Sequence, residues 1–329
     1  MPADINEFSE KIAKHVQRMN RFRAEIGKVI IGQDAMISRL LVGLLTDGHV
    51  LLEGVPGLAK TTAIKTLAEA LAVRFQRIQF TPDLLPSDLV GTMIYVPGEG
   101  VFKTRKGPLF SNFILADEIN RAPSKVQSAL LEAMQERQIT LGDATYPLED
   151  LFLVMATQNP IEQEGTYPLP EAQIDRFMFK LKITYPSQSE ERLIMDKVLG
   201  GVQAQVEPVL SAQDVLFMQK LVHKIYIDES VKQYILNIVT ATRFPETMGM
   251  KRIKNLIEYG ASPRASIFLG KGAKAVAFLA GRGYVTPQDV KDLAYDVLRH
   301  RIILTYEAEA EQMTTEDIIA RILETIPVP

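Results

Sequence analysis

The chain has 329 residues, enough for two domains, and its 47% hydrophobic and 23% charged residues are typical of a folded globular protein. The formal net charge is −3, so no overall positive field exists that would hold a nucleic acid. The absence of cysteine excludes disulfides, thiolate zinc sites and cysteine nucleophiles. Because the start, Met1-Pro2-Ala3-Asp4, is polar and every apolar run is far too short for a membrane span, we expect a soluble cytoplasmic protein.

The first half of the chain alternates short apolar runs with helical patterns, which is typical of a parallel sheet covered by helices. An amphipathic helix is expected first, over residues 5–26. Five strands are then expected at residues 49–53, 74–80, 112–116, 151–156 and 177–183, with helices at 60–72 and 124–137 between them. Residues 91–107 and 138–147 interrupt the alternation, and each is predicted to form a β-hairpin that projects from the sheet.

The pattern becomes almost wholly helical after residue 186, and residues 200–208 are predicted to form a linker. Helix start signals follow at Ser211, at Asp228 or Ser230, at Ser262 and at Thr286, and a last helix is expected from residue 315 to about residue 326. We therefore predict an α/β domain over residues 1–186, a connecting helix and linker over 187–210, and a smaller helical domain over 211–329.

The clearest chemical signal is a glycine-rich segment between an expected strand and an expected helix. Backbone N–H groups in such a loop, together with the helix N-terminus, bind the phosphates of a nucleotide. Lys60 is expected to reach the β- and γ-phosphates, and the Thr61 hydroxyl to ligate Mg²⁺. The strict pattern has glycine before the lysine, where this chain has Ala59. The predicted nucleotide-binding residues of the loop are Gly54, Val55, Pro56, Gly57, Leu58, Ala59, Lys60, Thr61 and Thr62.

The expected strand at 112–116 ends in two carboxylates, Asp117 and Glu118. Parallel strands that end side by side place their last residues around one crevice. Asp117 is therefore expected to hold Mg²⁺, and Glu118 to act as the general base on an attacking water. The alternative is an acidic helix start that is stabilised by the helix dipole.

These motifs resemble the MoxR group of AAA+ ATPases. Ordered matches run from residue 30 to residue 265, in the segments Ile30-Ile31-Gly32-Gln33, Phe80-Thr81-Pro82-Asp83-Leu84-Leu85-Pro86-Ser87-Asp88, Gly107-Pro108-Leu109-Phe110, Asp117-Glu118-Ile119-Asn120-Arg121-Ala122, Ala156-Thr157-Gln158-Asn159-Pro160, Leu169-Pro170-Glu171-Ala172-Gln173-Ile174-Asp175-Arg176-Phe177 and Gly260-Ala261-Ser262-Pro263-Arg264-Ala265. The resemblance implies a P-loop NTPase fold of the AAA+ type, with a parallel sheet between layers of helices, followed by a smaller all-α lid domain.

The resemblance also assigns roles to residues outside the loop. It implies that Asn159 is sensor 1, near the γ-phosphate or the attacking water, and that Arg264 is sensor 2 on the lid. Arg176 would be an arginine finger that acts on a neighbouring protomer, and Ile30 and Ile31 would contact the adenine. From the residues alone, a loop turn at the asparagine, core packing of the isoleucines, and structural or surface positions of the arginines remain open.

As a whole, the resemblance implies a Mg²⁺-dependent ATPase that binds ATP and ADP in a ring of identical copies, expected to be a hexamer. Its work would be chaperone-like remodelling or metal and cofactor insertion in protein clients, including proteins with von Willebrand factor A domains. The hairpins match inserts that line a pore or contact a client, and the basic run Lys103, Arg105 and Lys106 is either a contact for an acidic partner or a solvated loop. A DNA-remodelling motor and a nucleotide-gated scaffold with little turnover remain alternatives. The client, the regulation and the role of Arg121 are left undetermined by the sequence.

Overall fold

A computed structural model describes residues 2–55, 57–160, 165–201 and 204–329. They form two compact units. The sheet unit comprises residues 21–176 and 181–216, and the helical unit comprises residues 2–20, 177–180 and 217–329. Helix α1 (Pro2–Gly27), strand β9 (Phe179–Lys182) and helix α8 (Ala212–His223) each contribute to both units. Within the described ranges, no helix combines the length and the apolar character that crossing a membrane requires.

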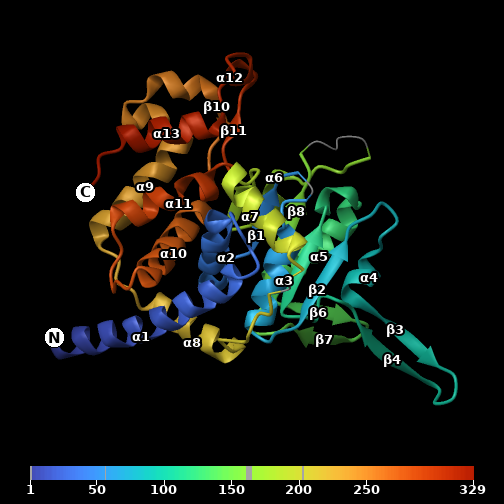
Figure 1. The fold of residues 1–329 in the computed structure, drawn as a ribbon. Helices are drawn as coiled ribbons and strands as arrows, with labels where there is room; N and C mark the ends of the chain where they lie inside the picture. Colours follow the sequence, from blue (N-terminus) through green and yellow to red (C-terminus); the bar gives the residue numbers. More distant parts are fainter. Residues whose placement is uncertain (1, 56, 161–164, 202–203) are drawn as a thin grey trace. The chain divides into compact units, whose positions relative to one another are not determined.

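The sheet unit is built on a five-stranded sheet with the strand order β2-β5-β8-β1-β9 (Figure 1). The strands are β1 (Val50–Glu53), β2 (Phe75–Gln79), β5 (Phe113–Asp117), β8 (Leu153–Gln158) and β9 (Phe179–Lys182). Neighbouring strands from β2 to β1 pair in parallel. The central strands β5, β8 and β1 are continuous apolar runs because both of their faces are buried, whereas the edge strand β2 exposes polar side chains. Each strand overlaps a predicted range, so the predicted α/β fold is confirmed.

Helices precede, connect and follow the strands of this unit. They are α2 (Asp34–Thr46), α3 (Lys60–Ala70), α4 (Pro86–Val90), α5 (Ser124–Glu136), α6 (Glu171–Ile174), α7 (Gln188–Leu199) and the 3₁₀ helix η1 (Ile119–Arg121). The starts of α3 and α5 agree with the predicted residues 60 and 124. Helix α2 was not predicted. Its residues 40–46 are all buried, so the apolar positions do not mark one face and the helical period is hidden.

Two antiparallel hairpins interrupt the α/β alternation where they were predicted. They are β3 (Gly91–Val96) with β4 (Val101–Lys106), and β6 (Gln138–Leu141) with β7 (Ala144–Pro147). Figure 1 shows the β3–β4 hairpin extending away from the sheet. Its base needs glycine, because a Cβ on Gly91 would lie 2.2 Å from the Arg105 carbonyl oxygen and the residue has φ +104°.

The helical unit contains α9 (Glu229–Arg243), α10 (Pro263–Leu279), α11 (Pro287–Leu298), α12 (Tyr306–Ala310), α13 (Thr315–Thr325) and the 3₁₀ helices η2 (Pro245–Met248) and η3 (Lys251–Leu256). Of the two predicted caps for α9, Asp228 is the one observed, and its side chain accepts the Ser230 N–H. Ser262 caps α10, and Thr286 forms a capping box with Asp289, as predicted. One short antiparallel pair, β10 (Ile257–Tyr259) with β11 (Ile303–Leu304), was not predicted. Apart from this strand pair, the named elements of the helical unit from α9 onward are helices, as expected.

Candidate functional site

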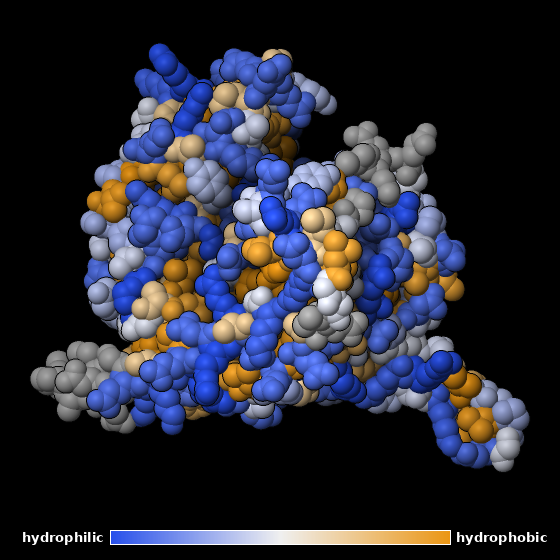
Figure 2. All heavy atoms as spheres, in the orientation of Figure 1, coloured by the Kyte–Doolittle hydropathy of each residue, from blue (hydrophilic) through white to orange (hydrophobic). Residues whose placement is uncertain are grey.

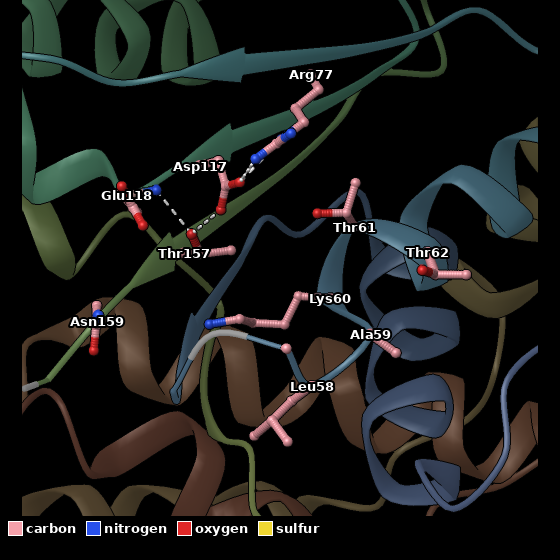
Figure 3. A pocket seen from close by; sticks show the side chains of 11 residues that line it. Leu58, Ala59, Lys60, Thr61, Thr62, Arg77, Asp117, Glu118, Thr157 and Asn159 are labelled. Carbon is pink, nitrogen blue, oxygen red and sulfur yellow. Dashed lines mark hydrogen bonds and ion pairs between the residues drawn. The ribbon is translucent and has the colours of Figure 1, made fainter. Parts of the chain in front are cut away.

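A pocket of about 430 Å³ lies at the edge of the sheet where β5 and β8 end. Its lining joins the predicted phosphate-binding loop to the predicted carboxylates (Figure 3). The lining residues are Gly57, Leu58, Ala59, Lys60, Thr61, Thr62, Arg77, Asp117, Glu118, Thr157 and Asn159. Nine of these eleven residues were predicted from the sequence to belong to one site.

The loop enters α3 through two residues with left-handed backbone conformations. Gly57 has φ +86° and Ala59 has φ +56°. The second value explains why the strict pattern prefers glycine there, because an L-residue is strained in this region. The Lys60 ammonium donates a hydrogen bond of 2.6 Å to the Gly54 carbonyl oxygen. Burial lowers the pKa of Lys60 below its ordinary value, while the charges of the nearby carboxylates act in the opposite direction.

Asp117 is held at the end of β5 by donors on both of its oxygens. The Thr157 hydroxyl donates to Oδ1 at 2.6 Å. Arg77, from the edge strand β2, donates to Oδ2 from Nε at 3.0 Å and from Nη2 at 2.6 Å (Figure 3). The hydroxyl of Thr157 also accepts the backbone N–H of Glu118 at 2.8 Å. One buried threonine on β8 therefore fixes both carboxylate residues relative to the sheet.

Glu118 has a left-handed backbone, with φ +56°, and its carboxylate is held by two neighbours. Gln79 Nε2 donates to Oε2 at 2.8 Å, and Arg121 Nη1 donates to the same oxygen at 3.1 Å. The Gln79 amide is oriented in turn, because Arg77 Nη2 donates to its Oε1 at 2.9 Å. A strained backbone of this kind persists only where the surroundings hold it, and such positions concentrate at functional sites.

Four residues of this arrangement were not identified from the sequence: Arg77, Gln79, Thr157 and Gln127. Arg77 and Gln79 stand two residues apart on β2 and so share a face, but no local pattern indicates that this face meets the end of β5. Gln127 is fully buried on α5 and donates to the carbonyl oxygens of Ile119, Ala122 and Tyr167. It thereby fixes the turn that follows Glu118. The sequence signal for Gln127 is its place among the apolar residues on one face of the expected helix.

The residues of the pocket fit a magnesium ion that is bound together with phosphates. Thr61 and Asp117 both line the pocket and carry a hydroxyl and a carboxylate, and oxygen is the ligand type that Mg²⁺ prefers. Among the described residues, no group of three or more histidine or acidic side chains is placed to hold a metal by itself. Mg²⁺ commonly uses one or two protein ligands and completes its shell with phosphate and water oxygens.

The remaining predicted residues do not line the pocket. Ile30 is buried at 5% exposure, and Ile31 and Val55 are partly exposed. Gly54 accepts the Lys60 hydrogen bond with its carbonyl oxygen, and its N–H donates to the Gln158 carbonyl oxygen at 3.3 Å. Pro56 lies outside the described residues. Arg264 is in the first turn of α10, in the helical unit, where its N–H is capped by Ser262, and its predicted role stays a prediction.

Arg176 is the last residue of the sheet unit before residues 177–180, which belong to the helical unit. Its Nη1 donates to the Leu131 carbonyl oxygen at 2.9 Å, and its buried Nε has no hydrogen-bond partner among the described residues. The segment that follows is held by cationic side chains after α11: Arg301 donates to the Phe177 carbonyl oxygen at 2.6 Å, and Arg299 donates to the Lys180 carbonyl oxygen at 2.7 Å. Arg176, the predicted arginine finger, is therefore followed directly in the chain by a segment that hydrogen bonds hold within the helical unit.

Comparisons with known proteins agree with this arrangement. The model of the ATPase family associated with various cellular activities (AAA) matches residues 49–179, and the AAA lid domain model matches residues 249–322. Chaperone MoxR1 of Mycobacterium tuberculosis is 50% identical over 98% of this chain and 85% of its own length, and Protein MoxR of Methylorubrum extorquens is 30% identical over 94% of both. A crystal structure of a candidate ATPase from Cytophaga hutchinsonii, 54% identical and covering 99% of both chains, has a TM-score of 0.93. The chain therefore belongs to the MoxR family of AAA ATPases.

Proposed function

We propose that this chain hydrolyses ATP with Mg²⁺ in the described pocket and uses the energy to remodel or mature protein clients in the cytoplasm. The observation that carries the proposal is the gathering of Lys60, Thr61, Asp117, Glu118 and Asn159 around one pocket. A phosphate-binding loop, a metal-binding carboxylate and a candidate base are the parts that phosphoryl transfer to water requires.

The loop would bind the phosphates of ATP. The Lys60 ammonium is partly buried, and among the described residues its hydrogen bond goes to a neutral carbonyl in the loop, that of Gly54. An anionic phosphate would compensate the desolvation that lowers its pKa. Thr61 and Asp117 would hold Mg²⁺, which when bound neutralises the charge that develops on the phosphates.

Glu118 would accept the proton of the attacking water. Its carboxylate accepts from Gln79 and Arg121, so it is oriented and confined to one position in the pocket. Asn159, at 8% exposure just beyond the end of β8, would orient the water or the γ-phosphate with its amide.

Glu118→Gln tests this role, because the amide keeps the shape of the side chain and cannot take the proton. We expect the variant to bind ATP and to lose at least about 100-fold in turnover under saturating Mg-ATP. The control is Glu149→Gln, which changes a solvent-accessible carboxylate that pairs with Arg74. This variant should retain the turnover of the parent. Turnover of Glu118→Gln at the parental rate would refute the assignment.

We further propose a ring of identical copies, a hexamer, in which Arg176 acts at the neighbouring protomer's γ-phosphate. The guanidinium would have to leave the Leu131 carbonyl to do so. A group supplied by a neighbour can be complemented: Arg176→Ala and Glu118→Gln should each be inactive, and mixing them should restore part of the turnover at concentrations at which rings form. Mixed rings without restored turnover would show that Arg176 acts within its own chain or only supports the fold.

The β3–β4 hairpin is the proposed client contact. Tyr95 is 51% exposed and Phe102 64% exposed, and their rings lie 5.2 Å apart across the two strands. Figure 2 shows apolar residues gathered toward the tip of the β3–β4 hairpin. The name chaperone, borne by the relative from Mycobacterium tuberculosis, supports protein clients, and we propose proteins with von Willebrand factor A domains and metal- or cofactor-dependent enzymes as classes. Tyr95→Ser with Phe102→Ser should abolish client capture and leave the basal turnover unchanged.

A further inference from the structure

The metal-binding carboxylate of the pocket already has a cationic partner. Both donors of the Arg77 fork converge on Oδ2 of Asp117, at 3.0 Å and 2.6 Å. The other oxygen, Oδ1, accepts from the Thr157 hydroxyl. The carboxylate is only 14% exposed, whereas the arginine side chain is 50% exposed and lies on an edge strand. Oδ2 is therefore covered by a group that has room to move away.

The arginine and a magnesium ion compete for the same oxygen. A dication at Oδ2 would stand within a few ångströms of the guanidinium, where like charges repel strongly because the site is partly shielded from water. The guanidinium hydrogens also fill the directions from which a metal approaches that oxygen. The neutral Thr157 donor on Oδ1 carries no such penalty and can stay in place.

We propose that Arg77 is a latch on the metal site: it covers Oδ2 of Asp117 until Mg²⁺ binds together with the nucleotide and displaces it. The inference rests on the proposed Mg²⁺-dependent function of this pocket. Arg77 is thus a positioning residue that sets the apparent Mg²⁺ affinity of nucleotide binding. Its removal should make Mg²⁺ bind more tightly, which is the opposite of what the loss of a ligand-binding residue would cause.

The test is a Mg²⁺ titration of the full chain with a non-hydrolysable fluorescent ATP analogue, with the analogue's affinity without metal measured in parallel. Arg77→Gln should lower the Mg²⁺ concentration at half-saturation by about threefold to tenfold, as expected for a partly exposed forked ion pair. Arg77→Lys retains the charge without the fork and should give a smaller decrease in the same direction. Arg74→Gln is the control: it removes the positive charge that pairs with Glu149, three residues before Arg77 in the chain. It should leave the Mg²⁺ midpoint unchanged.

Three results would overturn the inference. One is an unchanged or raised Mg²⁺ midpoint in Arg77→Gln, read from Arg77→Lys if the glutamine variant does not fold. Another is a large loss of metal-free nucleotide affinity, which would make Arg77 a phosphate ligand. A wild-type chain whose nucleotide binding does not depend on Mg²⁺ would refute the proposed metal site itself, and the latch with it.

Discussion

Acidification should destabilise the sheet unit through His49, which precedes β1 and is 6% exposed. Its Nδ1 accepts the Val154 N–H at 3.1 Å, and its Nε2 lies 3.3 Å from the Met134 carbonyl oxygen, so its partners assign the neutral tautomer with hydrogen on Nε2. Burial, and next the charge of Arg137, lower the pKa of this imidazole to about 3. Protonation would break the bond from Val154 and place a cation in the core.

The sign of the effect follows from the two states. The unfolded chain takes up a proton on His49 as the pH falls through 6.5, whereas the folded chain stays neutral until about pH 3. The stabilisation that neutral His49 contributes is therefore complete above pH 7.5. It is lost progressively as the pH falls from there toward 3. Between pH 7.5 and 5.5 the loss is about 1.4 kcal/mol, and it is insensitive to how far below 5 the folded pKa lies. Most carboxylates titrate below this interval.

The assay is urea unfolding at pH 7.5 and 5.5, followed by far-ultraviolet circular dichroism because the chain has no tryptophan. His49→Asn keeps an acceptor for the Val154 N–H and cannot titrate, so it should be less stable at pH 7.5 and lose about 1.4 kcal/mol less on acidification than the parent. His223→Asn, at an exposed position on α8, is the control for the loss of a histidine. An equal pH-dependent loss in His49→Asn and the parent would refute the reasoning.

Three further predictions concern stability. Ala59→Gly should raise the free energy of unfolding by about 0.5 to 1 kcal/mol in the same urea assay, because it relieves the left-handed backbone. Asp289→Ala should lower the free energy of unfolding by about 3 kcal/mol in the same urea assay, because it leaves Arg282 without the carboxylate that accepts two of its hydrogen bonds. Gly91→Ala should loosen the β3–β4 hairpin, since the new Cβ collides with the Arg105 carbonyl oxygen. Limited proteolysis should therefore cut the hairpin of this variant before the rest of the chain.

Much of the fold could be predicted because its signals are local. The strand before the loop, the loop and the start of α3 at Lys60 lie in one short stretch of chain, and each has its own residue pattern. The caps Asp228 and Ser262 likewise act on the turn that follows them. The β10–β11 pair escaped prediction because its strands have three and two residues and the segments are far apart in the sequence.

The supporting residues of the site depend on register between strands, which no local pattern supplies. Gln79 pairs in register with Asp117, and this pairing alone brings the Gln79 and Arg77 side chains to the two carboxylates. A shift by one residue would turn both side chains to the other face of the sheet. Thr157 could be placed at the end of a strand from the sequence, but its bond to Asp117 follows from the pairing of β5 with β8.

The charged side chains of the site therefore already have partners within the protein. Lys60 bonds within its own loop, Arg77 covers Asp117, and Arg121 contacts Glu118. Under the proposed function, nucleotide binding would exchange at least the first two of these contacts for phosphate and metal contacts, so the measured affinity would be a difference between two sets of interactions. A substitution that removes a ligand group weakens binding, whereas one that removes only a competing partner strengthens it. The direction of change, more than its size, distinguishes the residues that bind the nucleotide from those that hold the site in its absence.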